Sequence, residues 1–202
     1  MADTTKITLS DKELSLVTNA DWILTKHIII GKVYSLFADN IPVIGAAMKQ
    51  AGVVLPEEIG SSVPKIYKGE NYLQLPYVMF DYPRFFDGPH IFALRTMFWW
   101  GNFFSITLHV SGRYSNLVRD KIIRNEKELP GHFYIGIHED QWQHHFEENN
   151  FLPVKDTSRE ECIKMLSQND FIKIALKFNL REWNNMPALL EKGYYEIAEV
   201  LA

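Results

Sequence analysis

Histidine is the residue whose placement first suggests chemistry in this sequence. Six of the seven histidines fall between positions 90 and 145. In segment 132–138 polar or small residues alternate with apolar ones, so His138 and Tyr134 are expected on one face of a strand. His109 is expected on the more polar side of its own strand. Imidazoles bind zinc or iron, and they transfer protons near neutral pH.

The histidines suggest a metal site. We expect His109, His138 and one of His144 or His145 to lie on the same side of the sheet. Three imidazoles there could bind a zinc or iron ion and leave one of its coordination positions open. The spacing matches no HExxH or zinc-finger motif. The alternatives are acid–base catalysis by one histidine without a metal, or ordinary surface and hydrogen-bonded histidines.

The clearest local pattern is a β-hairpin. Segments 91–100 and 103–110 are rich in β-branched and aromatic residues, and the pair Gly101-Asn102 separates them. Two such runs joined by two turn-forming residues predict a hairpin with a two-residue turn.

The expected turn assigns the faces of this hairpin. A two-residue turn places Leu94 opposite His109 and Thr96 opposite Thr107. These residues then belong to a face that alternates aromatic rings with hydroxyl groups and one imidazole. The other face is apolar apart from Arg95, which needs an anionic partner if it is buried. That partner is either a carboxylate of the protein or a bound carboxylate or phosphate ligand.

Both faces of the hairpin are too apolar to remain open to water. One face can be covered by helices. The other is then covered by more of the chain, by a second subunit or by a ligand, because small-molecule pockets are also lined by aromatic walls with few polar groups. The candidate ligand-binding residues are Arg95, Thr107, His109 and Tyr134.

The pattern of elements predicts an α+β fold, an antiparallel β-meander of five or six strands with N-terminal and C-terminal helices packed on it. We expect one domain, with a helical segment 1–63, a sheet with one inserted helix in 64–147, and a helical segment 148–202. The expected helices are 10–17, 22–38, 40–52, 114–128, 158–166, 171–178 and one from 187 onward, and capping boxes of Ser10 with Glu13 and of Ser158 with Glu161 open the first and the fifth. Besides the hairpin, the expected strands are one ending in a turn at 68–70, then 71–81, 132–138 and 142–146, with a loop at 82–89.

Composition narrows the class of protein. The formal net charge of −4 offers no global attraction for nucleic acid or an anionic membrane. The longest run without Asp, Glu, Lys or Arg, 96–112, suits a hairpin better than a membrane span. The single cysteine, Cys162, permits no intrachain disulfide, and the first residues lack the apolar stretch of a signal peptide. We therefore expect a cytoplasmic protein.

No GxSxG, P-loop or GxGxxG motif is present in the sequence. The first functional hypothesis is a non-enzymatic interaction or assembly module that forms a homodimer through an aromatic sheet face. The alternative is a small-ligand-binding protein, or a metal-dependent enzyme that uses the histidines.

Overall fold

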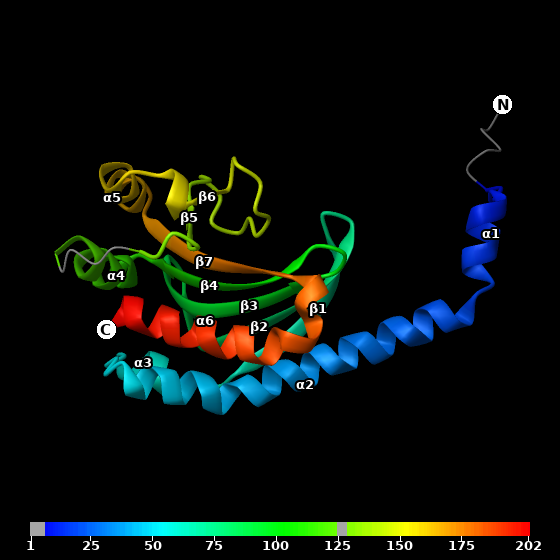
Figure 1. The fold of residues 1–202 in the computed structure, drawn as a ribbon, viewed down its shortest axis with the longest axis horizontal. Helices are drawn as coiled ribbons and strands as arrows, with labels where there is room; N and C mark the ends of the chain where they lie inside the picture. The colour runs from blue at the N-terminus through cyan, green and yellow to red at the C-terminus, as the bar shows by residue number, and fades with distance from the viewer. Residues whose placement is uncertain (1–6, 125–128) are drawn as a thin grey trace.

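A seven-stranded antiparallel sheet forms the centre of the computed structural model, which describes residues 7–124 and 129–202 (Figure 1). The strand order is β1-β2-β3-β4-β7-β5-β6, so β7 returns from late in the chain to lie between β4 and β5. The strands are β1 Lys65–Tyr72, β2 Leu75–Asp87, β3 His90–Trp99, β4 Phe103–Ser111, β5 Tyr134–Gly136, β6 Phe151–Pro153 and β7 Phe171–Asn179. The predicted α+β class is confirmed, with slightly more strands than expected.

Helices precede, interrupt and follow the sheet. They are α1 Asp11–Val17, α2 Ala20–Gln50, α3 Glu57–Gly60, α4 Arg113–Arg124, α5 Arg159–Gln168 and α6 Met186–Leu201, with short 3₁₀ turns η2 Val154–Asp156 and η3 Leu180–Asn185. Helix α1 begins at the predicted capping box, in which Ser10 and Glu13 cap each other. Residues 125–128, the last part of the helix expected at 114–128, lie outside the described residues.

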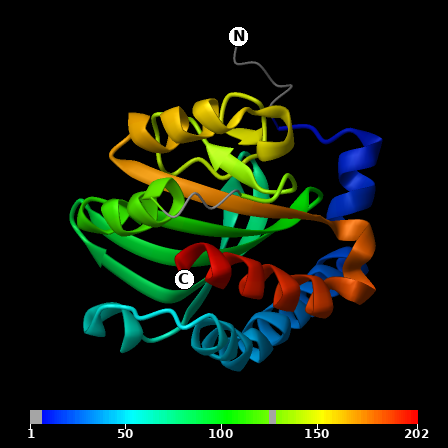
Figure 2. The same ribbon diagram turned by 60° about the vertical axis from the view of Figure 1, so that its left-hand side comes forward.

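The two faces of the sheet have different covers. Helices α2 and α6 lie on one face, where Leu166 of α5 joins the same buried cluster, and the loop 137–150 lies over the other (Figures 1 and 2). On the helix side, Val33 and Phe37 of α2 and Leu190 of α6 have no exposed surface. All nine residues of β4 are buried, so both of its faces are covered within one chain. Of the three covers considered from the sequence, the structure has the first, more of the chain, and the hairpin needs neither a second copy nor a ligand to cover it.

The hairpin of β3 and β4 is confirmed, but its predicted register is wrong by one residue. Trp99 pairs with Phe103, which leaves a three-residue loop of Trp100, Gly101 and Asn102. A two-residue type I′ turn needs positive φ at both central residues. Here Gly101 has φ 74°, and Asn102 does not lie in that region.

The shifted register changes the composition of the two faces. Arg95 now pairs with Thr107, and Ala93 with His109. The helix-facing side is accordingly apolar, apart from Thr96, whose hydroxyl lies 2.7 Å from that of Tyr194 on α6. Arg95, Thr107 and His109 share the side of the sheet that the loop 137–150 covers.

A two-residue turn of the predicted kind does occur, but between β1 and β2. Tyr72 pairs with Leu75, and the residues between them, Leu73 and Gln74, have φ 46° and 67°. The turn expected at 68–70 is wrong, because β1 runs on through Gly69. The loop expected at 82–89 is also mostly strand, since β2 continues to Asp87 beyond an irregularity between Asp81 and Arg84.

Five further expectations need correction. The helix expected at 171–178 is strand β7, and β6 and β7 both lie in segment 148–202, which was expected to be helical. Only Tyr134–Gly136 of 132–138 is strand, and 142–146 is irregular chain. The helices expected at 22–38 and 40–52 form one helix, α2, with Pro42 inside it.

Candidate functional site

The loop-facing side of the sheet carries a centre of buried polar side chains. Strand pairing produces it, because Asp81 pairs with Arg95, Arg95 with Thr107, and His109 with Lys173. Side chains at paired positions lie on the same face of a sheet. All five are nearly inaccessible to solvent: Asp81, Arg95, Thr107, His109 and Lys173. We call these five residues the polar centre.

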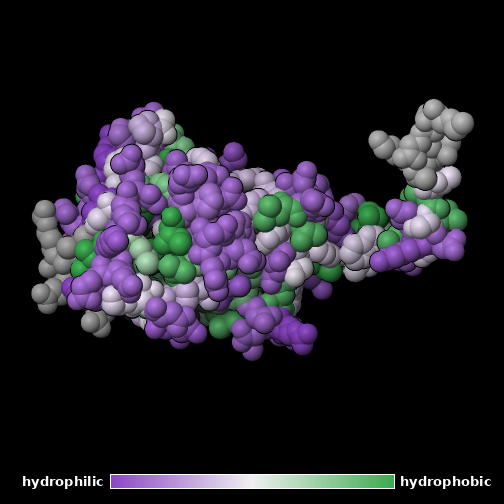
Figure 3. Space-filling view, turned by 90° about the horizontal axis from the view of Figure 1, so that it is seen from above, coloured by the Kyte–Doolittle hydropathy of each residue, from purple (hydrophilic) through white to green (hydrophobic). Residues whose placement is uncertain are grey.

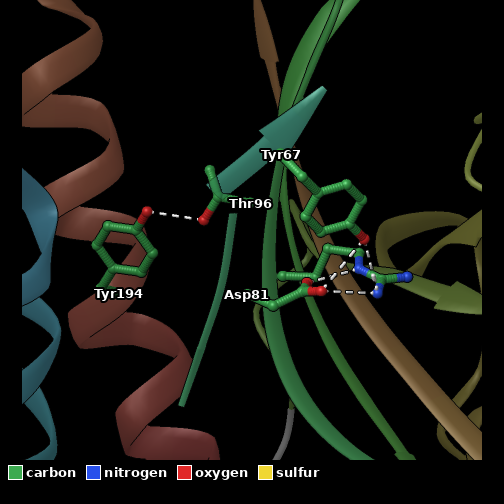
Figure 4. A network of polar contacts seen from close by, with 5 residues as sticks. Tyr67, Asp81, Thr96 and Tyr194 are labelled. Atoms are coloured by element: carbon green, nitrogen blue, oxygen red, sulfur yellow. Dashed lines mark hydrogen bonds and ion pairs between the residues drawn. The ribbon is translucent and has the colours of Figure 1, made fainter. Parts of the chain in front are cut away.

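The ion pair of Arg95 and Asp81 is the best-defined contact of the polar centre. The Arg95 Nε donates to Asp81 Oδ1 at 2.7 Å, and Nη2 donates to Oδ2 at 2.9 Å. The Tyr67 hydroxyl donates to Asp81 Oδ2 at 3.3 Å (Figure 4). Burial raises the pKa of Tyr67 to about 12. Burial also disfavours the charged guanidinium, but the bonds and attraction to Asp81 outweigh it and raise the pKa of Arg95. Arg95 thus has a protein partner, as one of the two sequence interpretations expected.

His109 joins the sheet to the loop. Its Nε2 lies 2.9 Å from Gln141 Oε1, and its ring meets that of Trp142 edge-on at 5.4 Å between centroids. Burial, with the nearby positive charge of Arg95, lowers the pKa of His109 to about 3. The imidazole is therefore neutral at physiological pH and donates through Nε2 to the Gln141 oxygen.

Lys173 is a buried cation that contacts no carboxylate among the described residues. Its Nζ donates to the Gln143 carbonyl oxygen at 2.6 Å and to Asn150 Oδ1 at 3.3 Å, and it lies 4.8 Å from the centre of the Phe151 ring. Burial lowers the pKa of Lys173 to about 7, although the charge of Asp140 acts in the opposite direction.

The loop 137–150 covers the polar centre. Besides its contacts to His109 and Lys173, its backbone amides of His144 and His145 donate to the Tyr72 hydroxyl at 2.7 and 3.0 Å. Within the described parts of the chain, no buried side-chain nitrogen or oxygen lacks a hydrogen-bond partner. The loop therefore satisfies the polar groups that the sheet presents to it.

The structure brings together three of the four predicted ligand-binding residues, Arg95, Thr107 and His109. The fourth, Tyr134, lies on the same face, because it and Thr107 both pair with Ala175, and its ring packs edge-on against Phe146 at 5.0 Å within an aromatic cluster. A ligand-binding role for these residues stays a prediction.

The predicted metal ligands are not assembled into one group. His109 contacts Gln141, whereas His138 Nδ1 accepts a bond from the Asp140 amide. Burial, with the charges of Arg95 and Lys173, lowers the pKa of His144 well below its usual range. No group of three His, Cys, Asp or Glu side chains suited to a metal occurs in residues 7–124 and 129–202.

Two open hollows, of about 490 and 430 Å³, flank the loop near the polar centre. Both are lined by Gln141, Asp170 and Phe171, and neither is lined by a residue of the polar centre. A third hollow, of about 290 Å³, lies between α4 and α5 beside Cys162, whose thiol pKa is raised by burial. The surface hollows therefore stop short of the groups with the most perturbed pKa values.

A second candidate site is a projecting arm, which we define as residues 7–28. Helix α1 and the first turns of α2 extend from the body of the protein (Figure 1), and apolar surface is visible along them (Figure 3). No residue of α1 is buried. The arm carries most of the exposed large hydrophobic side chains: Ile7, Leu9, Leu14, Leu16, Val17, Trp22, Ile23, Leu24 and Ile28.

Contacts with the body begin only along α2. Trp22 meets Trp100 of the hairpin loop edge-on at 5.9 Å, and Lys26 forms an ion pair with Glu70. Leu24 and Ile28 nevertheless remain 57% and 60% exposed. Apolar side chains exposed together in this way mark interaction surfaces.

Sequence reasoning missed parts of both sites. Lys173 lies in a segment that was expected to be a helix, and Asp81 was not assigned as the partner of Arg95, although Arg95 was expected to need one.

In comparisons with known proteins, no family model, no curated protein and no solved structure matches this chain.

The protonation state of His109 predicts instability in acid. The unfolded chain binds a proton near pH 6.5 and the folded chain only near pH 3, so stability present above pH 6.5 is lost as the pH falls. We expect the free energy of unfolding to drop by roughly 2 kcal/mol between pH 6.5 and pH 5 on this account. Urea titrations should show a smaller drop for His109→Phe, while the surface variant His132→Phe keeps it. Equal drops in all three proteins would contradict the assignment.

Proposed function

We propose that this protein is a non-enzymatic assembly module that forms a homodimer through its N-terminal arm. The observation that carries the proposal is the set of large apolar side chains exposed together on α1 and the first turns of α2. The arm replaces the aromatic sheet face as the proposed interface, because the chain itself covers both faces of the sheet.

The short length of α1 supports a partner. Isolated helices below about 12–15 residues are marginal in water, because too few hydrogen bonds offset the cost of nucleation. Helix α1 has seven residues, and its capping box adds only about 1 kcal/mol. Burial of Leu14 and Val17 against a partner would supply the stabilisation that the chain itself does not.

A protein partner fits the arm better than a membrane. Residues 7–28 contain three carboxylates and two lysines, whereas helices that bind anionic membranes are rich in Lys and Arg. Helix α2 is long and apolar enough to cross a membrane by length and composition alone. Val33, Phe37 and Ile44, however, are wholly buried against the rest of the protein, and spanning would remove them from its core. The cytoplasmic location stays a prediction.

The alternative, a small-ligand-binding protein or a metal-dependent enzyme, has weaker support. The side chains that would act, Arg95, His109 and Lys173, already bond to groups of the protein. A ligand could reach them only after the loop 137–150 had moved.

Ile28→Asp tests the proposal. A carboxylate in the interface would have to be buried, which costs several kcal/mol, so we expect the dimer to dissociate at least a hundredfold more readily in sedimentation equilibrium. Val54→Asp is the matched control, because Val54 is 90% exposed and lies outside the arm. Equal dissociation constants for the two variants would exclude the arm as the interface.

A further inference from the structure

The exposed side chains of the arm form two stripes. On α1, Asp11, Leu14 and Val17 are spaced by three residues and share one side of the helix. On α2, Leu24, Ile28 and Lys32 are spaced by four residues, and all three are exposed. Each stripe therefore has two apolar side chains near the turn between α1 and α2, and one charged side chain farther from that turn.

The two stripes match each other when the helices run antiparallel. Val17 then meets Leu24, Leu14 meets Ile28, and Asp11 meets Lys32. Packing of an i+3 ridge into an i+4 groove is one of the preferred geometries of helix pairs, with axes crossing at about 20°. Asp11 and Lys32 have opposite charges, and neither contacts an oppositely charged group in the described parts of its own chain.

We infer that α1 of each copy packs antiparallel on the first turns of α2 of a second copy, in a two-fold exchange of arms. This inference rests on the proposed dimer and specifies how it is built. A two-fold axis makes each contact occur twice and closes the assembly at two chains.

Two rival pairings fit the arm less well. Parallel packing of α1 on the second copy's α1 would place the carboxylates of Asp11 and Glu13 near their counterparts, which is repulsive, and antiparallel packing would place Asp11 opposite Val17, with no opposite charge to meet it. Folding of α1 back onto α2 of the same chain is not what the structure has, because Leu14 and Ile28 are 52% and 60% exposed. Helix α1 instead turns away from α2 at Thr18 and Asn19, where the Asn19 side chain caps α2 (Figure 1).

Cross-linking of two different single-cysteine proteins tests the pairing. Leu14→Cys and Ile28→Cys are made separately with Cys162→Ser, mixed at equal concentration and oxidised. A disulfide between the two must then join different chains, and we expect a covalent dimer of about twice 23.5 kDa. Leu14→Cys mixed with Val54→Cys in the same background is the control and should remain uncross-linked.

A charge exchange tests the same pairing without cysteine. Asp11→Lys places like charges together twice in the dimer, and we expect the dissociation constant to rise about tenfold. Adding Lys32→Asp restores opposite charges and should bring the constant back near that of the unmodified protein.

The outcomes separate this inference from the proposed function. If the unmodified protein is a dimer that Ile28→Asp weakens, but Leu14→Cys and Ile28→Cys do not cross-link, the exchange of arms is wrong and the proposed function stands. Cross-linking of Leu14→Cys to itself alone would indicate the α1–α1 pairing and also overturn the inference. If the unmodified protein is a monomer at all concentrations, the proposed function itself fails.

Discussion

The free energy of unfolding should rise by roughly 3 kcal/mol between pH 7 and about pH 9.5, because the structure buries Lys173 without a carboxylate in contact. In the unfolded chain this amine keeps its proton up to about pH 10.5, whereas in the folded chain its pKa is about 7. Between these values the unfolded chain binds more protons, so stability increases with pH. Below pH 7 both states are protonated and the penalty for burying the charge is complete.

The increase has an upper limit set by tyrosine. Burial raises the pKa of Tyr67 to about 12, so the unfolded chain loses this proton first, near pH 10. Stability contributed by Tyr67 is therefore lost above about pH 10, and the effect of Lys173 is best measured below that value.

Urea titrations at several pH values between 7 and 9.5 measure this dependence, and Lys173→Met isolates its cause. Methionine keeps a long apolar side chain and has no proton to bind, so the variant should lose most of the slope. Lys177→Met is the control, because Lys177 is an exposed residue of the same strand. An unchanged slope in Lys173→Met would show that this amine is not the group that titrates.

Asp81→Asn should lower the free energy of unfolding by about 3–5 kcal/mol. The substitution keeps the shape of the side chain but leaves the guanidinium of Arg95 buried without a counter-charge, which is the costly way to break a buried ion pair. Glu70→Gln breaks the exposed pair with Lys26 and should cost less than about 1 kcal/mol.

A double variant distinguishes loss of the ion pair from general damage to the sheet. Replacing both partners, Asp81→Leu with Arg95→Met, removes the uncompensated charge and should recover most of the stability lost in Asp81→Asn. A loss below about 1 kcal/mol in Asp81→Asn would contradict the buried ion pair itself.

Local signals in the sequence predicted the local structure well. The capping boxes that begin at Ser10 and Ser158 start α1 and α5 as expected, and the hairpin lies where the paired β-rich runs placed it. These features depend on interactions within a few residues, which a single sequence contains.

Features decided by tertiary contacts were predicted poorly. Strand β7 was expected to be a helix. It lies between β4 and β5 with both faces covered, and a strand buried on both sides shows no clear alternation of polar and apolar residues by which it could be recognised. The shift of one residue in the hairpin register moved Arg95 from the expected apolar face to the side of Thr107 and His109.

The candidate sites were predictable only in part. The sequence indicated that Arg95 would need an anionic partner, but only the pairing of β2 with β3 identifies Asp81. The helices of the arm could be predicted from their caps, while their exposure could not, because apolar residues such as Leu14 and Ile28 are usual in buried helices.

The most direct test of the proposed function is the mass of the unmodified protein in sedimentation equilibrium over a range of micromolar concentrations. Exchange of arms between two copies predicts a particle of about twice 23.5 kDa that dissociates on dilution. A mass of 23.5 kDa at every concentration would contradict it.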